Sequence, residues 1–162
     1  MKTLILVRHA EASSGHPAWP DRDRPLTERG LRDVAAMGQR LAQRGAKPDL
    51  LLASPATRAL TTAEHLAEAL GIPRKDIVVN DRLYAAPASA LLAVIGELGD
   101  APQRLMLVAH NPGLSDLAQR YAPEIVHLPT CAVAEFTFAA AAWGDIGEAK
   151  PTQVVFDFPK KG

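Results

Sequence analysis

Short apolar runs alternate with amphipathic segments along most of the chain. The apolar runs have the length and the branched residues of buried strands. The amphipathic segments repeat their apolar residues every three to four positions, as helices do. We therefore predict strands at 3–7, 49–53, 77–79 and 104–109, with helical segments after them. Strands that alternate with helices are typical of an α/β fold built on a parallel sheet.

The predicted helices have start and stop residues of the expected kinds. Thr27 is placed to cap the first helix, and Ser54 to cap the second, with Pro55 in its first turn. Glycine and proline follow the last apolar positions, where helices commonly end. The helices are expected between 27 and 45, between 54 and 71, between 87 and 99, and from 113 onward.

The last part of the chain has a different pattern. Residues 132–138 alternate weakly between apolar and polar, 153–158 resemble them, and a turn region lies at 144–147. This pair of segments adds two strands to the strand–helix series. We predict a three-layer α/β sandwich in which a mostly parallel central sheet has helices on both faces. Residues 1–162 contain no internal repeat or linker and are expected to form a single domain.

The amino-acid composition argues against several classes of function. The 162 residues are 48% hydrophobic and 22% charged, and 18 basic residues balance 18 acidic ones. A net charge of zero argues against nucleic acid and anionic membranes as partners. No run approaches the ~20 apolar residues of a membrane span. The single cysteine, Cys131, fits a reducing compartment. We expect a cytoplasmic protein without a metal or other cofactor.

Polar residues follow three of the predicted strands. Arg8 and His9 come directly after the first, the segment from Ser54 to Arg58 follows the second, and His110 and Asn111 follow the fourth. The carboxyl ends of parallel strands meet at one edge, where ligands bind in open α/β sheets. Arg58 also lies in the first turn of a helix, where free N–H groups favour anions. Two guanidinium and two imidazole groups at one edge predict a phosphate pocket.

Four motifs resemble the histidine phosphatase superfamily, which includes the phosphoglycerate mutases and acid phosphatases. They are V-R-H-A-E in the first strand, P-L-T-E-R-G and S-P-A-T-R-A-L-T-T-A-E at the first two long helices, and V-A-H-N-P late in the chain. The combination of the four motifs in this order is specific to the superfamily, although each motif alone is weak evidence for it. Within the superfamily, the short chain is most similar to the SixA-type phosphohistidine phosphatases. The resemblance implies a phosphoglycerate mutase-like fold.

The resemblance also implies roles for the residues at the strand ends. His9 would be the nucleophile that becomes transiently phosphorylated, Arg8 and Arg58 would hold the phosphoryl oxygens, and His110 would donate a further hydrogen bond to them. A covalent relay of this kind divides one phosphoryl transfer into two easier steps. Further contacts to phosphate or substrate are expected from three more side chains: Ser14, Arg24 and Asn111.

The sequence departs from the family pattern at two places. Ala10 stands where most members have glycine, and one methyl group is acceptable there if the backbone is not left-handed. Many members also carry a glutamate proton donor after the leucine equivalent to Leu83, where this chain has Tyr84. An alkoxide leaving group needs that proton, which is commonly worth ~10²–10⁴-fold in rate. Imidazole leaves far more readily, so phosphohistidine is favoured as substrate, although Glu11 could still supply a proton.

We therefore predict a phosphatase that acts through a phosphohistidine intermediate. Its expected partner is a phosphorylated protein, such as a histidine phosphotransfer domain. A phosphatase for small phosphomonoesters is the alternative within the same class. A phosphoprotein-binding module that keeps the pocket without turnover is the alternative from another class. Whether the loop 13–25 closes over the site is left open by the sequence.

Overall fold

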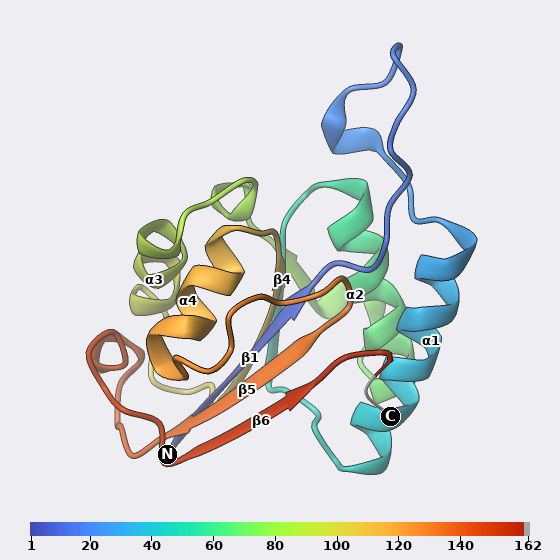
Figure 1. Cartoon of the computed structure of the whole chain (residues 1–162). Coiled ribbons are helices and arrows are strands. Elements are labelled where there is room, and N and C mark those ends of the chain that lie inside the picture. Colours follow the sequence, from blue (N-terminus) through green and yellow to red (C-terminus); the bar gives the residue numbers. More distant parts are fainter. Residues whose placement is uncertain (161–162) are drawn as a thin grey trace.

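A six-stranded sheet lies between two layers of helices in the computed structural model of the chain, which describes residues 1–160 (Figure 1). The predicted α/β sandwich is confirmed. The helices α1 (Glu28–Gln43) and α2 (Thr57–Leu70) cover one face of the sheet, and α3 (Ala88–Gly96) and α4 (Gly113–Tyr121) cover the other. Figure 1 shows the two helix pairs on opposite sides of β1.

The strands follow the order β3-β2-β4-β1-β5-β6. The first four along the chain run parallel to one another, whereas β5 is antiparallel to β1, and β6 to β5. The mostly parallel sheet is thus confirmed, with the antiparallel pair at one edge. The bounds are β1 Lys2–Arg8, β2 Leu50–Ala53, β3 Ile77–Val79, β4 Arg104–Ala109, β5 Val133–Phe138 and β6 Gln153–Asp157.

Strand β1 is buried on both faces because it lies between β4 and β5 with helices above and below. Leu4 and Leu6 belong to the core under α3 and α4, whereas Ile5 and Val7 belong to the core under α1 and α2. All four side chains are completely buried. The apolar run that predicted this strand thus supplies both cores, and it fixes where the polar residues Arg8 and His9 emerge.

Two helix boundaries differ from the prediction. Helix α2 begins at Thr57 after Ala56, and no side chain caps it. The expected Ser54 cap is wrong because Ala56, and not Ser54, directly precedes the helix; the Ser54 hydroxyl contacts the N–H of Ala56 and the ring of His110. Helix α3 ends at Gly96 rather than near Gly99. The predicted cap on α1 is confirmed, since the Thr27 hydroxyl accepts the N–H of Gly30 at 3.0 Å.

The segment that follows His9 is held against the start of α1. The Glu11 carbonyl accepts the N–H of Thr27 at 2.9 Å, and Ala12 forms an isolated antiparallel bridge with Leu26. A methyl group on Gly30 would lie only 2.2 Å from the Glu11 carbonyl oxygen, so this close approach requires glycine. The loop between the two bridge residues projects from the body of the molecule (Figure 1) and contains a 3₁₀ turn at Asp21–Asp23.

A search of residues 1–160 finds no helix that is long and apolar enough to cross a membrane.

Candidate active site

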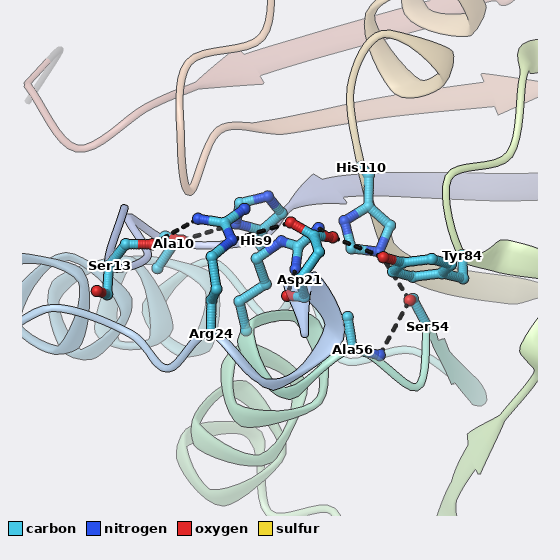
Figure 2. Close-up of polar contacts among 10 residues, drawn as sticks. His9, Ala10, Ser13, Asp21, Arg24, Ser54, Ala56, Tyr84 and His110 are labelled. Atoms are coloured by element: carbon cyan, nitrogen blue, oxygen red, sulfur yellow. Dashed lines mark hydrogen bonds and ion pairs between the residues drawn. The ribbon is translucent and has the colours of Figure 1, made fainter. Parts of the chain in front are cut away.

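The three polar strand ends meet at one edge of the sheet, as predicted. Arg8 at the end of β1 pairs with Ala109 at the end of β4, and Val108 pairs with Ala53 at the end of β2. The next residues are His9, His110 and Ser54. The ring centroids of the two histidines lie 5.3 Å apart, and both side chains are buried. Figure 2 shows the two imidazoles on either side of the Asp21 side chain.

The imidazole of His9 is held in one tautomer by the backbone of the next residue. Its Nδ1 lies 2.8 Å from the carbonyl oxygen of Ala10. Because a carbonyl oxygen only accepts, Nδ1 carries the proton of the neutral ring, and Nε2 keeps its lone pair. Nε2 is therefore the nitrogen that is able to act as a nucleophile.

A buried threonine fixes the backbone that orients His9. The hydroxyl of Thr62 accepts the N–H of Ala10 at 3.0 Å and donates to the carbonyl of Arg58 at 2.7 Å. Positive φ angles occur at Ala85 and Cys131 among the described non-glycine residues, and not at Ala10. The backbone at Ala10 is thus not left-handed, and the methyl group of this residue is acceptable at a position where most members of the family have glycine.

Both histidines are neutral in the folded protein at neutral pH. Burial, together with the positive charges of Arg58 and Arg8, lowers the pKa of His9 from 6.5 to about 4, although the hydrogen bond to the Ala10 carbonyl opposes this shift. Burial, followed by the charge of Arg58, lowers the pKa of His110 to about 3. A neutral His9 has the free lone pair that nucleophilic attack requires.

These lowered pKa values predict a pH-dependent stability. The unfolded chain binds more protons than the folded one from about pH 6.5 down to about 4 at His9 and about 3 at His110, so the contribution of the two histidines to stability is fully present above pH 6.5. The free energy of unfolding is expected to fall as the pH drops through this window. Chemical denaturation at several pH values should show a shallower fall for His110→Asn. The same change at the exposed His127 should leave the slope as in wild type, and an equal slope in all three proteins would contradict the prediction.

Three buried nitrogens of the site have no hydrogen-bond partner within residues 1–160. They are Nε of Arg8, Nε of Arg58 and Nδ1 of His110, and together they make up all such buried side-chain atoms in that part of the chain. An unpaired buried polar group costs about 1–3 kcal/mol. Such groups are rare in folded proteins, and their concentration at one edge indicates a binding site for an anion.

Terminal nitrogens of the two arginines bind neighbouring loops. Arg8 donates from Nη1 to the carbonyl of Leu128 at 3.1 Å. Arg58 donates from Nη1 to the carbonyl of Asp21 at 2.9 Å and from Nη2 to its carboxylate at 3.0 Å. Arg58 is 6% exposed, so its charge acts in a poorly solvated place where electrostatic attraction is strong. The two guanidinium groups would supply positive charge to an anion bound at this edge of the sheet.

Asp21 is a site residue that our sequence reasoning missed. Its carboxylate accepts the Tyr84 hydroxyl at 2.6 Å and the Arg24 Nε–H at 3.0 Å, in addition to Arg58 (Figure 2). The bond from Tyr84, followed by those from the two arginines, lowers the pKa of Asp21 well below its usual range. Asp21 is therefore ionised at neutral pH. Its carboxylate is bound to the guanidinium of Arg58, which we expect to hold a phosphoryl group.

A phosphoryl group must compete with Asp21 for Arg58, so removing this charge should strengthen anion binding. Asp21→Asn is expected to bind inorganic phosphate about three- to tenfold more tightly at low ionic strength, because one like charge is lost next to the site. Isothermal titration calorimetry at pH 7 measures this. Asp23→Asn, on the same 3₁₀ turn, is the matched control and should bind as wild type does. Unchanged or weaker binding by Asp21→Asn would show that the carboxylate does not compete.

Of the four additional site residues predicted from the sequence, Arg24 and Ser14 lie near the two histidines or the loop beside them. Arg24 lies beside His9 in Figure 2 and donates to Asp21 and to the carbonyl of Ser13. Ser14 is exposed and lines a cavity of about 570 Å³ that also includes Asp21 and Arg24. These two residues therefore border the site.

Asn111 and Glu11 are engaged in structural contacts. The Asn111 amide donates to the Leu128 carbonyl at 2.9 Å, and its oxygen accepts both the N–H and the hydroxyl of Ser115. The Glu11 carboxylate accepts the Thr27 hydroxyl at 2.9 Å and lies 3.6 Å from the Arg29 guanidinium. The structure thus places Glu11 against the start of α1, and its role as proton donor stays a prediction.

No group of three or more His, Cys, Asp and Glu side chains within the described part of the chain is arranged to hold a metal ion. Cys131 is buried, and burial raises the pKa of its thiol to about 12. Its thiol is therefore protonated at neutral pH and is a poor nucleophile.

One family model and several known proteins are similar to this chain. The family model of the histidine phosphatase superfamily (branch 1) matches residues 4–84. A 2,3-bisphosphoglycerate-dependent phosphoglycerate mutase of Chelativorans sp. is 34% identical over 90 residues, which are 51% of this chain and 43% of the mutase. The chain thus spans less than half the length of this curated relative.

Two solved structures are similar over nearly the whole chain. The proposed phosphohistidine phosphatase SixA of Agrobacterium tumefaciens has a TM-score of 0.80 and 26% identity, covering 95% of this chain and 97% of that one. Its counterpart from Nakamurella multipartitia has a TM-score of 0.76 and 26% identity, covering 95% of each chain. With the matched family model and the geometry of the strand ends, these similarities lead to one conclusion. The chain belongs to the histidine phosphatase superfamily, branch 1.

Proposed function

We propose that the protein is a phosphatase that removes the phosphoryl group from phosphohistidine in proteins, with His9 as nucleophile. The observation that carries this proposal is the juxtaposition of the His9 lone pair with three buried, unpaired donors of Arg8, Arg58 and His110. A phosphoryl group placed among them would satisfy those donors and present its phosphorus to Nε2. The similarity to SixA-type structures supports the same substrate class.

The reaction would proceed in two displacements. In the first, Nε2 of His9 attacks phosphorus, the P–N bond of the substrate breaks, and its electron pair returns to the leaving imidazole, which takes a proton from solvent. In the second, water attacks phosphorus, loses a proton to solvent, and the electron pair of the P–Nε2 bond returns to His9. Arg8, Arg58 and His110 would stabilise the charge on the phosphoryl oxygens in both steps.

The carboxylates around the site favour a leaving group that needs no strong acid. Asp21 is close to His110 but is held in its ionised form by Tyr84 and two arginines. Glu11 is bound to Thr27 and Arg29. Neither arrangement offers an acid for an alkoxide. Imidazole is protonated readily by solvent, so a phosphoramidate substrate matches this site better than a sugar phosphate does.

Substrates that differ in their leaving group test the proposal. We expect kcat/KM to be highest for a phosphohistidine-bearing phosphotransfer domain, lower for an aryl phosphate, and lower by another ~10²-fold for an alkyl phosphate such as phosphoserine, because only the last needs a proton donor. Phosphate release by His9→Ala is the background control.

Two other outcomes would replace the proposal. Equal turnover of alkyl and histidine phosphates would indicate a phosphatase for small phosphomonoesters, which the similarity to a phosphoglycerate mutase favours. Binding of phosphate without turnover of any donor would indicate a phosphoprotein-binding module.

A further inference from the structure

Ser54 lies directly after β2 and is completely buried, yet no step described above uses its side chain. Its hydroxyl has two polar contacts. The oxygen accepts the N–H of Ala56 at 3.3 Å and lies 2.7 Å from Nε2 of His110 (Figure 2). The contact with His110 connects the residue after β2 with the residue after β4, which are 56 positions apart in the chain.

The direction of the hydrogen bond to His110 follows from the proton count of the hydroxyl. A serine hydroxyl carries one proton and has two lone pairs. The backbone N–H of Ala56 only donates, so it occupies a lone pair. Within the described residues, the remaining contact of the completely buried Ser54 hydroxyl is Nε2 of His110. If Nε2 carried a proton and donated it to the second lone pair, the buried hydroxyl proton would have no acceptor, which is costly. We therefore take the Ser54 hydroxyl as the donor and Nε2 as the acceptor. Nε2 must then be unprotonated.

A neutral imidazole has a single N–H, so the proton of His110 lies on Nδ1. The ring is neutral because burial and the charge of Arg58 oppose its protonation. Nδ1 is one of the three buried nitrogens without a partner among residues 1–160. Figure 2 shows the His110 ring with Ser54 on one side and Asp21 and His9 on the other. The proton on Nδ1 is thus available to the anion site.

We propose that Ser54 is a positioning residue that fixes the tautomer of His110, so that the neutral ring donates its Nδ1–H to a phosphoryl oxygen. This inference rests on the proposed function. In the other tautomer, Nδ1 would present a lone pair to the phosphoryl oxygens and repel them. The single proton of a neutral histidine can donate from Nδ1 only when Nε2 is unprotonated, and a hydrogen bond from the Ser54 hydroxyl to Nε2 favours that tautomer.

The ¹⁵N resonances of the His110 ring test the tautomer directly and require no turnover. In wild type, we expect a protonated Nδ1 and an unprotonated Nε2, assigned by their loss in His110→Asn. In Ser54→Ala, the ring is expected to shift toward the tautomer with the proton on Nε2, which free histidine prefers. A wild-type ring protonated on Nε2 would overturn the proposal, whether or not the protein is a phosphatase.

Kinetics separate positioning from a structural role at the start of α2. Ser54→Ala should lower kcat/KM for the phosphohistidine donor about tenfold, less than the ~10²–10³-fold that removal of a whole donor costs. Ser54→Thr, which keeps the hydroxyl, should restore most of it. In a His110→Ala background, Ser54→Ala should have no further effect, since Ser54 acts through His110. An equal loss in both backgrounds would mean that Ser54 only supports the fold, and would overturn the proposal.

Discussion

His9→Ala is expected to lose at least about 10⁴-fold in turnover of every phosphoryl donor, because no other group then accepts the phosphoryl. In the structure, Nε2 of His9 is the nitrogen with the free lone pair, and the hydrogen bond from Nδ1 to Ala10 keeps it so. Because the pKa of His9 is lowered, its ring is also neutral at pH 7. Steady-state phosphate release measures the loss.

Binding and folding controls make this result specific. His9→Ala keeps Arg8, Arg58 and His110, so it should still bind inorganic phosphate with an affinity within a few fold of wild type. His127→Ala, at an exposed histidine, should retain full turnover. Turnover by His9→Ala above one tenth of the wild-type rate would remove His9 from the mechanism.

Arg58→Ala is expected to lower kcat/KM by about 10²–10³-fold, since it removes a buried charged donor to the phosphoryl oxygens. Arg58 lies in the first turn of α2, where the residue is 6% exposed and its Nε is unpaired among the described residues. Arg58→Lys should regain only a small part of the loss, because an ammonium group lacks the planar fork that matches phosphate. Initial rates with an aryl phosphate measure both variants.

The contact between Arg58 and Asp21 requires a further control. Removing Arg58 leaves the Asp21 carboxylate near the site with fewer partners, so repulsion contributes to the loss. The double variant Arg58→Ala with Asp21→Asn should recover several-fold over Arg58→Ala alone. Arg74→Ala, at an exposed arginine outside the site, should not change the rate. Wild-type kcat/KM in Arg58→Ala would contradict the assigned anion pocket.

The fold was largely predictable because its strands are short, apolar and separated by helices with clear periodicity. The same pattern placed Arg8, His9 and His110 at strand ends, and parallel pairing of β1, β2 and β4 brings those ends together. Thr27 was predictable as a cap because a cap is a local interaction with a residue three positions away. Elements and contacts of short range were thus accessible from the sequence.

The contacts that complete the site were not predictable because they join distant segments. Tyr84 meets Asp21 across 63 positions, and Thr62 meets Ala10 across 52. Ser54 followed by proline has the composition of a helix start, yet its hydroxyl contacts His110, which directly follows β4. An aspartate in a loop rich in proline and charge gave no sign of a contact with Arg58. Each assignment depends on which loops meet above the sheet edge, and local pattern does not encode that.

Trapping the covalent intermediate tests the central claim most directly. Wild type is mixed with a phosphohistidine-bearing phosphotransfer domain, quenched in alkaline denaturant within milliseconds to seconds, digested with trypsin and analysed by fragment-resolved mass spectrometry. The peptide 9–22 begins at His9 and also contains His16, so fragment ions must separate the two. We predict one phosphoryl group on His9, stable in alkali and lost in mild acid. Phosphate release from an enzyme that stays unlabelled, or label on another residue, would contradict the account.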